Sequence, residues 1–312
     1  MPVTASDLYD YVQCPHRVTM NLVGDPSQRD PVSPFVELLW ERGNAYEREV
    51  IARLSQTETI VDLSSYKEDE KERRTLEAMR EGADLIYSGR ISSGDLVGIP
   101  DLLKREGEGY VPVDIKSGRG EEGGDDDTDP KPKLHYAVQL ALYVDILERL
   151  GLSAGRYGFI LDINGEEVRY DLSGSRGPRK QETLWQEYQE ALSETRAIYD
   201  RRTETLPAYA SVCKLCHWYS SCLKALRDAN DLTLIPRLGR TSRDVLADEF
   251  PTVSDLAECN PDAYVRSKNK TMFQRVGAET LRTYHARAKL LATPGAKPYL
   301  KQSVRPCQRA VG

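Results

Sequence analysis

Apolar residues recur along the chain with two spacings, and each spacing predicts a different kind of element. A spacing of three or four residues is typical of a helix with one buried face, whereas strict alternation is typical of a strand. Helices are predicted at residues 4–13, 33–54, 67–80, 135–150 and 178–200. Strands are predicted at residues 84–91, 95–104, 110–116, 156–163 and 166–172. Strands followed by a buried helix and a hairpin, inside long flanking helices, predict an α/β fold with a mixed sheet flanked by helices.

Two of these strands, joined by a polar turn, carry two carboxylates and an ammonium group. Asp101 lies in the first strand, and Asp114 and Lys116 lie in the second. Residues two apart in a strand point to the same face, so Asp114 and Lys116 project together, and an antiparallel return can bring Asp101 beside them. Carboxylate oxygens suit a hard divalent cation, and an ammonium group stabilises charge on a phosphate. The alternative is an ordinary strand pair whose charged residues face water.

The helix at 135–150 is apolar on most of its circumference, which predicts that it is buried. Gln139 and Tyr143 are four residues apart and therefore lie one turn from each other on the same face. Buried polar groups need partners, and a neighbouring catalytic site would supply them. A glutamine bonded to the backbone explains the pattern equally well.

Composition limits the class of protein. With 312 residues, two domains are the default expectation, and 29% charged against 39% hydrophobic residues describes a globular chain. No apolar run is long enough to span a bilayer, and the first residues lack a basic-then-apolar signal, so the sequence predicts a cytoplasmic protein. The net charge of −6 excludes a general basic coat for nucleic acid. A local basic groove stays open, because acidic residues are concentrated at 121–129.

Three cysteines are clustered in the second half of the chain. Cys213, Cys216 and Cys222 have the spacing C-x2-C-x5-C, and Cys14 lies about two hundred residues upstream. Four thiolates fit either tetrahedral zinc or an iron–sulfur cluster, and a tight triplet with one distant partner favours the cluster. Its predicted role is structural, because it would close a long loop. The alternative, three buried cysteines on one helix, fits poorly because these spacings do not share a helical stripe.

Five motifs stand in order along the chain. They are Cys14-Pro15, Pro100-Asp101, Asp114-Ile115-Lys116, the pair Gln139 and Tyr143, and the cysteine triplet. The middle three resemble the PD-(D/E)XK nuclease superfamily in its RecB-like branch. With the cysteines, the chain resembles the iron–sulfur RecB-like nucleases, which include the CRISPR-associated RecB-like exonucleases. It most closely resembles RecB-like nucleases that carry helix-hairpin-helix repeats behind a restriction-endonuclease-like core.

The resemblance implies a role for each residue of the strand pair. Asp101 and Asp114 would hold Mg²⁺ or Mn²⁺, with the Ile115 carbonyl oxygen as a further ligand. Lys116 would be the catalytic lysine, beside water that attacks a phosphodiester.

The resemblance also assigns the remaining motifs. Gln139 and Tyr143 would position the substrate or the lysine. A [4Fe–4S] cluster would be held by Cys14, Cys213, Cys216 and Cys222.

One position departs from the family pattern. The family places a histidine in the first long helix as another metal ligand, and here that position is Tyr46. Neutral tyrosine, with an ordinary pKa of about 10, is a poor Mg²⁺ ligand. Either Glu47 or another carboxylate of this helix replaces the histidine, or the metal site is weakened.

The segment behind the cysteines contains two glycine turns between helical patterns, at Gly239 and Gly277. They resemble helix-hairpin-helix units, whose backbone amides bind a DNA phosphate without reading sequence. Arg237, Arg240 and Arg243 lie beside the first turn. The alternative is a helical bundle with glycine C-caps.

These expectations define three regions: a nuclease domain at 1–228, a small all-α helix-hairpin-helix region at 229–295, and a tail at 296–312. Relatives often continue into a further domain, so a protein partner could supply one here.

The sequence therefore predicts a metal-dependent DNA nuclease that acts in repair, recombination or CRISPR-type processing, on single- or double-stranded DNA. The first alternative is a DNA-binding module with an inactive or weakened site, suggested by Tyr46. A remote alternative is an iron–sulfur DNA glycosylase. In those enzymes, however, all four cysteines are local and follow the hairpin, whereas here the triplet precedes it and Cys14 is distant.

Overall fold

The computed structural model describes residues 1–123, 129–175 and 181–296. The chain divides into two compact units, Met1–Leu206 and Pro207–Gly312, and each is described here by itself. The predicted domain boundary at residue 228 stays a prediction. Within the described residues, no helix is both long enough and apolar enough to cross a lipid bilayer.

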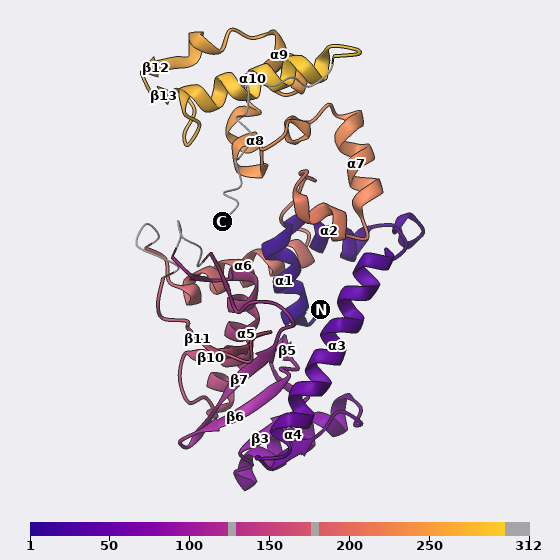
Figure 1. Ribbon diagram of the computed structural model, residues 1–312, viewed down its shortest axis with the longest axis vertical. Coiled ribbons are helices and arrows are strands. Elements are labelled where there is room, and N and C mark those ends of the chain that lie inside the picture. Colours follow the sequence, from indigo (N-terminus) through magenta and orange to yellow (C-terminus); the bar gives the residue numbers. More distant parts are fainter. Residues whose placement is uncertain (124–128, 176–180, 297–312) are drawn as a thin grey trace, which may run out of the picture. The chain divides into compact units, whose positions relative to one another are not determined.

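The first unit is built on a mixed six-stranded sheet with the strand order β11-β10-β7-β6-β3-β2 (Figure 1). β10 runs parallel to β7 and β2 parallel to β3, whereas β6 is antiparallel to both of its neighbours. The strands are β2 (Ile60–Asp62), β3 (Leu85–Tyr87), β6 (Leu102–Glu106), β7 (Gly109–Ile115), β10 (Tyr157–Leu161) and β11 (Glu167–Asp171). This architecture confirms the predicted α/β fold with a mixed sheet.

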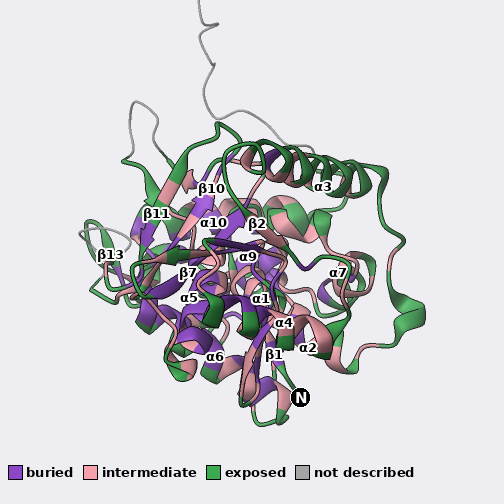
Figure 2. Ribbon diagram, turned by 90° about the horizontal axis from the view of Figure 1, so that it is seen from below, coloured by how far each residue is buried: buried purple, intermediate pink, exposed green. Residues whose placement is uncertain are grey.

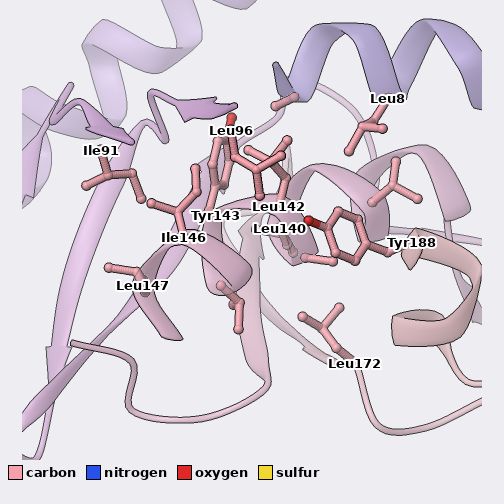
Figure 3. Close-up of a cluster of buried hydrophobic side chains, with 14 of the residues drawn as sticks. Leu8, Ile91, Leu96, Leu140, Leu142, Tyr143, Ile146, Leu147, Leu172 and Tyr188 are labelled. Carbon is pink, nitrogen blue, oxygen red and sulfur yellow. The ribbon is translucent and has the colours of Figure 1, made fainter. Parts of the chain in front are cut away.

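One face of the sheet is covered by α5 (Leu134–Leu150), which has nine buried residues as its apolar sequence predicts. α1 (Ala5–Gln13) and α6 (Leu184–Tyr199) pack around it. Figure 3 shows Leu140, Leu142 and Leu147 of α5 among side chains of these neighbours. This cluster is the main hydrophobic core, and it fixes the position of α5 against the strands.

The opposite face of the sheet carries α3 (Pro34–Leu54), seen beside β6 in Figure 1. Val50 of α3 is fully buried against Leu102, Val113 and Ile115. Adjacent residues of a strand point to opposite faces, so Asp114 projects away from this cluster and toward α5.

The predicted strand at 95–104 is wrong, because the structure breaks it in two. β5 (Leu96–Gly98) belongs to a small sheet of order β1-β5-β4, with β1 at Val3–Thr4 and β4 at Ile91–Ser93. The predicted strand at 84–91 is likewise divided between β3 and β4. Pro100 has no backbone N–H and restricts the residue before it, so the ladder ends there and resumes at Leu102. The break leaves Asp101 at the first turn into β6.

The helices begin and end close to the predicted residues. α1 starts with a capping box between Thr4 and Asp7, and α4 (Glu68–Glu81) ends at Gly82 in the left-handed conformation. The predicted start of α6 at residue 178 lies outside the described residues. The sequence did not predict α2 (Pro15–Val23), which begins directly after α1 with proline at its first position. The remaining short elements of this unit are η1 (Pro26–Gln28), β8 (Glu121–Glu122) and β9 (Lys131–Pro132).

The second unit is a helical region with its own core. Phe250, Leu256 and Leu281 are buried in that core. Its elements are η2 (Ser211–Leu215), α7 (Tyr219–Asp228), η3 (Leu232–Leu234), α8 (Arg240–Leu246), α9 (Val253–Glu258), η4 (Pro261–Tyr264), β12 (Val265–Ser267), β13 (Lys270–Thr271) and α10 (Ala278–Ala292). The predicted tail from 297 onward lies outside the described residues.

The two glycine turns of this region lie at the starts of helices. Gly239 and Gly277 are the N-cap residues of α8 and α10, with ordinary negative φ angles of −89° and −73°. The alternative in which they are C-caps is therefore wrong. Two residues before each glycine, Arg237 and Arg275 have left-handed φ angles of +67° and +63°.

Candidate active site

The pairing of β6 with β7 brings the two predicted carboxylates together. Leu102 is opposite Val113 in the register, so Asp101 and Asp114, the residues just outside that pair, are neighbours. The Oδ2 atom of Asp101 accepts a hydrogen bond from the Ile115 amide at 2.6 Å. The backbone carbonyl of Asp101 accepts another from the Ser88 amide at 2.9 Å. The side chain and the backbone of Asp101 are therefore both fixed.

Lys116 completes this group. Its Nζ atom lies 3.0 Å from Oδ2 of Asp114. Asp114 is only 2% exposed, so this ammonium–carboxylate pair lies in a buried setting. A buried carboxylate oxygen with unused capacity is unfavourable unless a cation or donor reaches it. The donor set, two neighbouring carboxylates with one ammonium group beside them, fits a hard divalent cation.

The electrostatics of the site show a deficit of positive charge. Burial, followed by repulsion from Asp114, raises the pKa of Asp101 to about 7, and the charge of Glu47 adds to this. Lys116 and the Ile115 amide oppose the rise without cancelling it. Burial lowers the pKa of Lys116, but the two aspartates outweigh it and the net pKa is raised. One ammonium group therefore does not balance the carboxylates, and a divalent cation would.

The first long helix contributes Glu47 to this site, while Tyr46 is used for packing. The hydroxyl of Tyr46 donates a short hydrogen bond to the Asp162 carbonyl oxygen, and its ring packs with the cluster around Val50. Oε1 of Glu47 accepts a hydrogen bond from the Tyr87 hydroxyl at 2.8 Å. Glu47 is therefore the residue of this helix whose charge reaches Asp101.

The helix α5 places Tyr143 beside the carboxylates. Tyr143 is buried, and burial followed by the charges of Asp114 and Asp101 raises its pKa. Its ring packs on the bare backbone of Gly98, where an added Cβ would lie 2.5 Å from Cδ1 of the ring. Gln139 has a buried amide oxygen without a hydrogen-bond partner among the described residues, so the backbone does not satisfy it.

Three residues of the site were missed by the sequence reasoning. Tyr87 holds Glu47, and the Tyr136 ring lies 5.6 Å from Nζ of Lys116. The third, Asp162, accepts hydrogen bonds from the amides of Gly120 at 3.2 Å and Asn164 at 2.8 Å. Tyr136 could have been found, because it lies three residues before Gln139 on the same helix. Tyr87 has no local sequence signal, since strand pairing brings it here, whereas Asp162 caps the turn that follows it.

The cysteine triplet lies at the start of the second unit. Sγ of Cys213 accepts a hydrogen bond from the Ala210 amide, and Sγ of Cys216 accepts one from the Trp218 amide, each at 3.4 Å. Cys14 belongs to the first unit. Neither these cysteines nor the carboxylates form a complete metal set: throughout residues 1–123, 129–175 and 181–296, no three His, Cys, Asp or Glu side chains are grouped so that they could hold a metal ion.

A family model described as the PD-(D/E)XK nuclease superfamily matches residues 3–223. No curated protein matches the chain. A solved structure, the crystal structure of SSO0001, is similar over 71% of this chain and 85% of its own, with 13% identity and a TM-score of 0.34.

Proposed function

The chain belongs to the PD-(D/E)XK nuclease superfamily, and on that premise we propose that it is a metal-dependent deoxyribonuclease. The observation that carries the proposal is the pair of neighbouring carboxylates, Asp101 and the buried Asp114, with the single ammonium group of Lys116 3.0 Å from Oδ2 of Asp114. A phosphodiester hydrolase needs a cation site and a fixed positive charge at one point. We place the activity in DNA repair, recombination or CRISPR-type processing.

We assign one group of residues to the cation and Lys116 to the phosphate. Asp101, Asp114, the Ile115 carbonyl and Glu47 would hold Mg²⁺ or Mn²⁺, which when bound polarises the phosphate and lowers the pKa of water. Lys116, which lies 3.0 Å from Asp114, would stabilise negative charge on the phosphate.

Two residues of α5 lie next to the carboxylates and Lys116. Tyr143 fills the space behind Asp114, and Gln139 offers its unsatisfied amide oxygen to the substrate or to Lys116. Both are positioning residues in this proposal.

End-labelled single- and double-stranded DNA, incubated with Mg²⁺ or Mn²⁺, tests the proposal. We expect cleavage by the wild type and a loss of at least about a hundredfold in Asp114→Ala and Lys116→Ala, because each removes a charge at the reacting phosphate. Lys104→Ala and Glu167→Ala are matched controls, since these residues form an ion pair at 2.6 Å elsewhere on the sheet. Cleavage that survives in Asp114→Ala would disprove the assignment.

The alternative of a DNA-binding module predicts a different result. It is favoured by Tyr46, which occupies the position of the expected histidine and is tied to the Asp162 carbonyl. Wild-type protein that binds DNA and shows no cleavage with either metal would establish it.

We propose further that Cys14, Cys213, Cys216 and Cys222 hold a structural [4Fe–4S] cluster. Amide hydrogen bonds to Cys213 and Cys216 support this, because such bonds stabilise metal-bound thiolates. Anaerobically purified protein should be brown and absorb broadly near about 400 nm. Cys222→Ser should lose the colour, and Cys259→Ser should keep it. Colourless protein with stoichiometric zinc would overturn the cluster.

The helical region of the second unit is proposed to bind the DNA backbone through its two glycine turns. Each turn combines a left-handed arginine with a glycine two residues later that is the N-cap of a helix. A strained residue at a surface turn is a feature that function commonly retains. Binding of this kind is independent of sequence and falls steeply with salt.

A further inference from the structure

The first half of α3 is unusually apolar for an exposed helix. Phe35 and Trp40 are each 59% exposed, and Leu38 and Leu39 are each 43% exposed. Figure 2 shows the helix exposed along most of its length. Single exposed apolar side chains are common, but four within six residues form a patch, and patches of this kind mark binding surfaces.

The patch begins where α3 leaves the sheet. At Val50 the helix is fully buried, and at Tyr46 it is tied to the Asp162 carbonyl. One turn further toward its start, Gly43 faces Ser117, whose Oγ would lie 3.8 Å from an added Cβ. Ser117 directly follows Lys116, so at Gly43 the helix α3 adjoins the strand end that carries the candidate active site.

Trp40 continues the stripe that reaches the active site. Residues three or four apart on a helix share a face, which aligns Trp40, Gly43, Glu47 and Val50. Trp40 is seven residues before Glu47, or roughly 10 Å along the axis. Phe35 and Leu39, one turn apart, lie beside this stripe and widen the apolar surface.

We propose that Trp40 is a stacking site for an unpaired base of the substrate strand, next to the phosphate that Lys116 and a cation at Asp101 and Asp114 would bind. This rests on the proposed nuclease function. Aromatic side chains bind single strands by stacking on base faces, and these faces are covered by neighbouring bases in an intact duplex. The site therefore selects unpaired DNA, either a single strand or a frayed end.

A second copy of the chain is a less suitable occupant. Stable dimers bury about 800 Å² on each partner, and four partly exposed side chains offer roughly half of that. The position also favours DNA, because the patch adjoins the end of β7 that carries Lys116, where Gly43 faces Ser117.

Intrinsic fluorescence can report on this site alone. The chain has three tryptophans, and Trp185 and Trp218 are 7% and 0% exposed. We would titrate the Asp114→Ala protein, in EDTA to prevent cleavage, with a short oligothymidylate and with a blunt-ended duplex. The single strand should quench the exposed tryptophan, and the duplex should not.

Substitution gives the expected size of the effect. Trp40→Leu should abolish the quenching and weaken single-strand binding by about five- to a hundredfold, since one stacked base contributes about 1–3 kcal/mol. Trp40→Phe should retain most of the affinity, and Val23→Ala, an exposed apolar control at the end of α2, should change nothing. Thermal melting would confirm that each variant is folded.

The outcomes separate this proposal from the nuclease assignment. Quenching with no cleavage by the wild type would uphold the stacking site and disprove the nuclease. Cleavage with unchanged single-strand affinity in Trp40→Leu would overturn the stacking site alone. A dimer that Trp40→Leu converts to monomer, with DNA binding unchanged, would show that the patch joins two copies and would also overturn it.

Discussion

At the scale of single residues, the site is organised by the repulsion between Asp101 and Asp114. The aspartates are held together by the strand register and by the Ile115 amide, and burial prevents water from screening them. The fold therefore carries an electrostatic cost that a bound cation would remove.

The repulsion between the two aspartates should make the free energy of unfolding of the metal-free protein depend on pH. The folded pKa of Asp101, about 7, lies above its ordinary value of 3.8. The folded state thus binds more protons than the unfolded state between these values, and the free energy of unfolding falls as pH rises through that window. The slope is at most about 1.4 kcal/mol per pH unit.

Chemical denaturation in EDTA at several pH values would measure it. The wild type should lose stability relative to Asp101→Asn as the pH rises from about 4 to 7, because asparagine does not titrate. Parallel curves for the two proteins would contradict the prediction.

Gly98 tests the packing behind the site. Gly98→Ala places a methyl group 2.5 Å from the Tyr143 ring, which is buried and cannot turn away. We expect a loss of about 1–3 kcal/mol in the free energy of unfolding. Gly43→Ala is the matched control: its nearest neighbour is 3.8 Å away and it is in a helix interior, so stability should rise by about 0.5–1 kcal/mol. Equal effects of the two variants would refute this interpretation.

At the scale of elements, α3 is held to the sheet by few contacts, and Tyr46 is one of them. Tyr46→Phe removes the hydrogen bond to the Asp162 carbonyl and keeps the packed ring. We expect a loss of about 0.5–1.5 kcal/mol in thermal or chemical unfolding. Unchanged stability would show that the ring alone holds the helix.

Replacing Arg237 in the first glycine turn of the second unit should raise stability but weaken DNA binding. Arg237 has a φ of +67°, a conformation that glycine adopts without strain. Arg237→Gly should therefore raise stability, by up to about 1 kcal/mol after the added freedom of the unfolded chain is counted. The same change should weaken DNA binding. It should also reduce the slope of log K against log[salt] by about 1, the contribution of one phosphate contact. Denaturation and salt-dependent DNA titration would measure the two effects, and weaker stability would contradict the first.

The elements themselves were largely predictable from the sequence, because their patterns are local. The apolar circumference of α5 and the two neighbouring strand patterns at 156–163 and 166–172 both predict what the structure shows. The break at Pro100 was missed, since alternation on both sides hides a change of sheet. β2 was missed because a strand of three residues carries too little pattern.

The candidate site was predictable in part. Asp101, Asp114 and Lys116 were found because strand spacing and a polar turn already place them together, and their chemical roles stay predictions. Tyr87 could not be found, because its contact with Glu47 joins segments forty residues apart through the sheet and α3.

At the scale of the whole molecule, the family match and the compact units divide the chain differently. The match ends at residue 223, just after the cysteine triplet, whereas the compact unit ends at Leu206. The segment between these limits therefore belongs to the family domain by sequence.

Two fragments test this difference. Residues 1–228 should fold and cleave DNA, whereas residues 1–206 should melt at lower temperature and lose colour, because three of the four proposed thiolates are absent. Melting and cleavage assays on both would decide, and equal stability of the two fragments would show that the cysteine segment is dispensable.

The break at Pro100 has a consequence for the choice of ion. Asp101 follows a peptide segment that leaves one sheet and enters another, while Asp114 lies within a continuous strand. The register of β6 with β7 and the Ile115 amide set the gap between the carboxylates, and the rigidity of the junction between the two sheets determines how far that gap can widen. We expect a loosened junction to accept ions of larger radius, so that this loop governs whether Mg²⁺, Mn²⁺ or the wider Ca²⁺ fits.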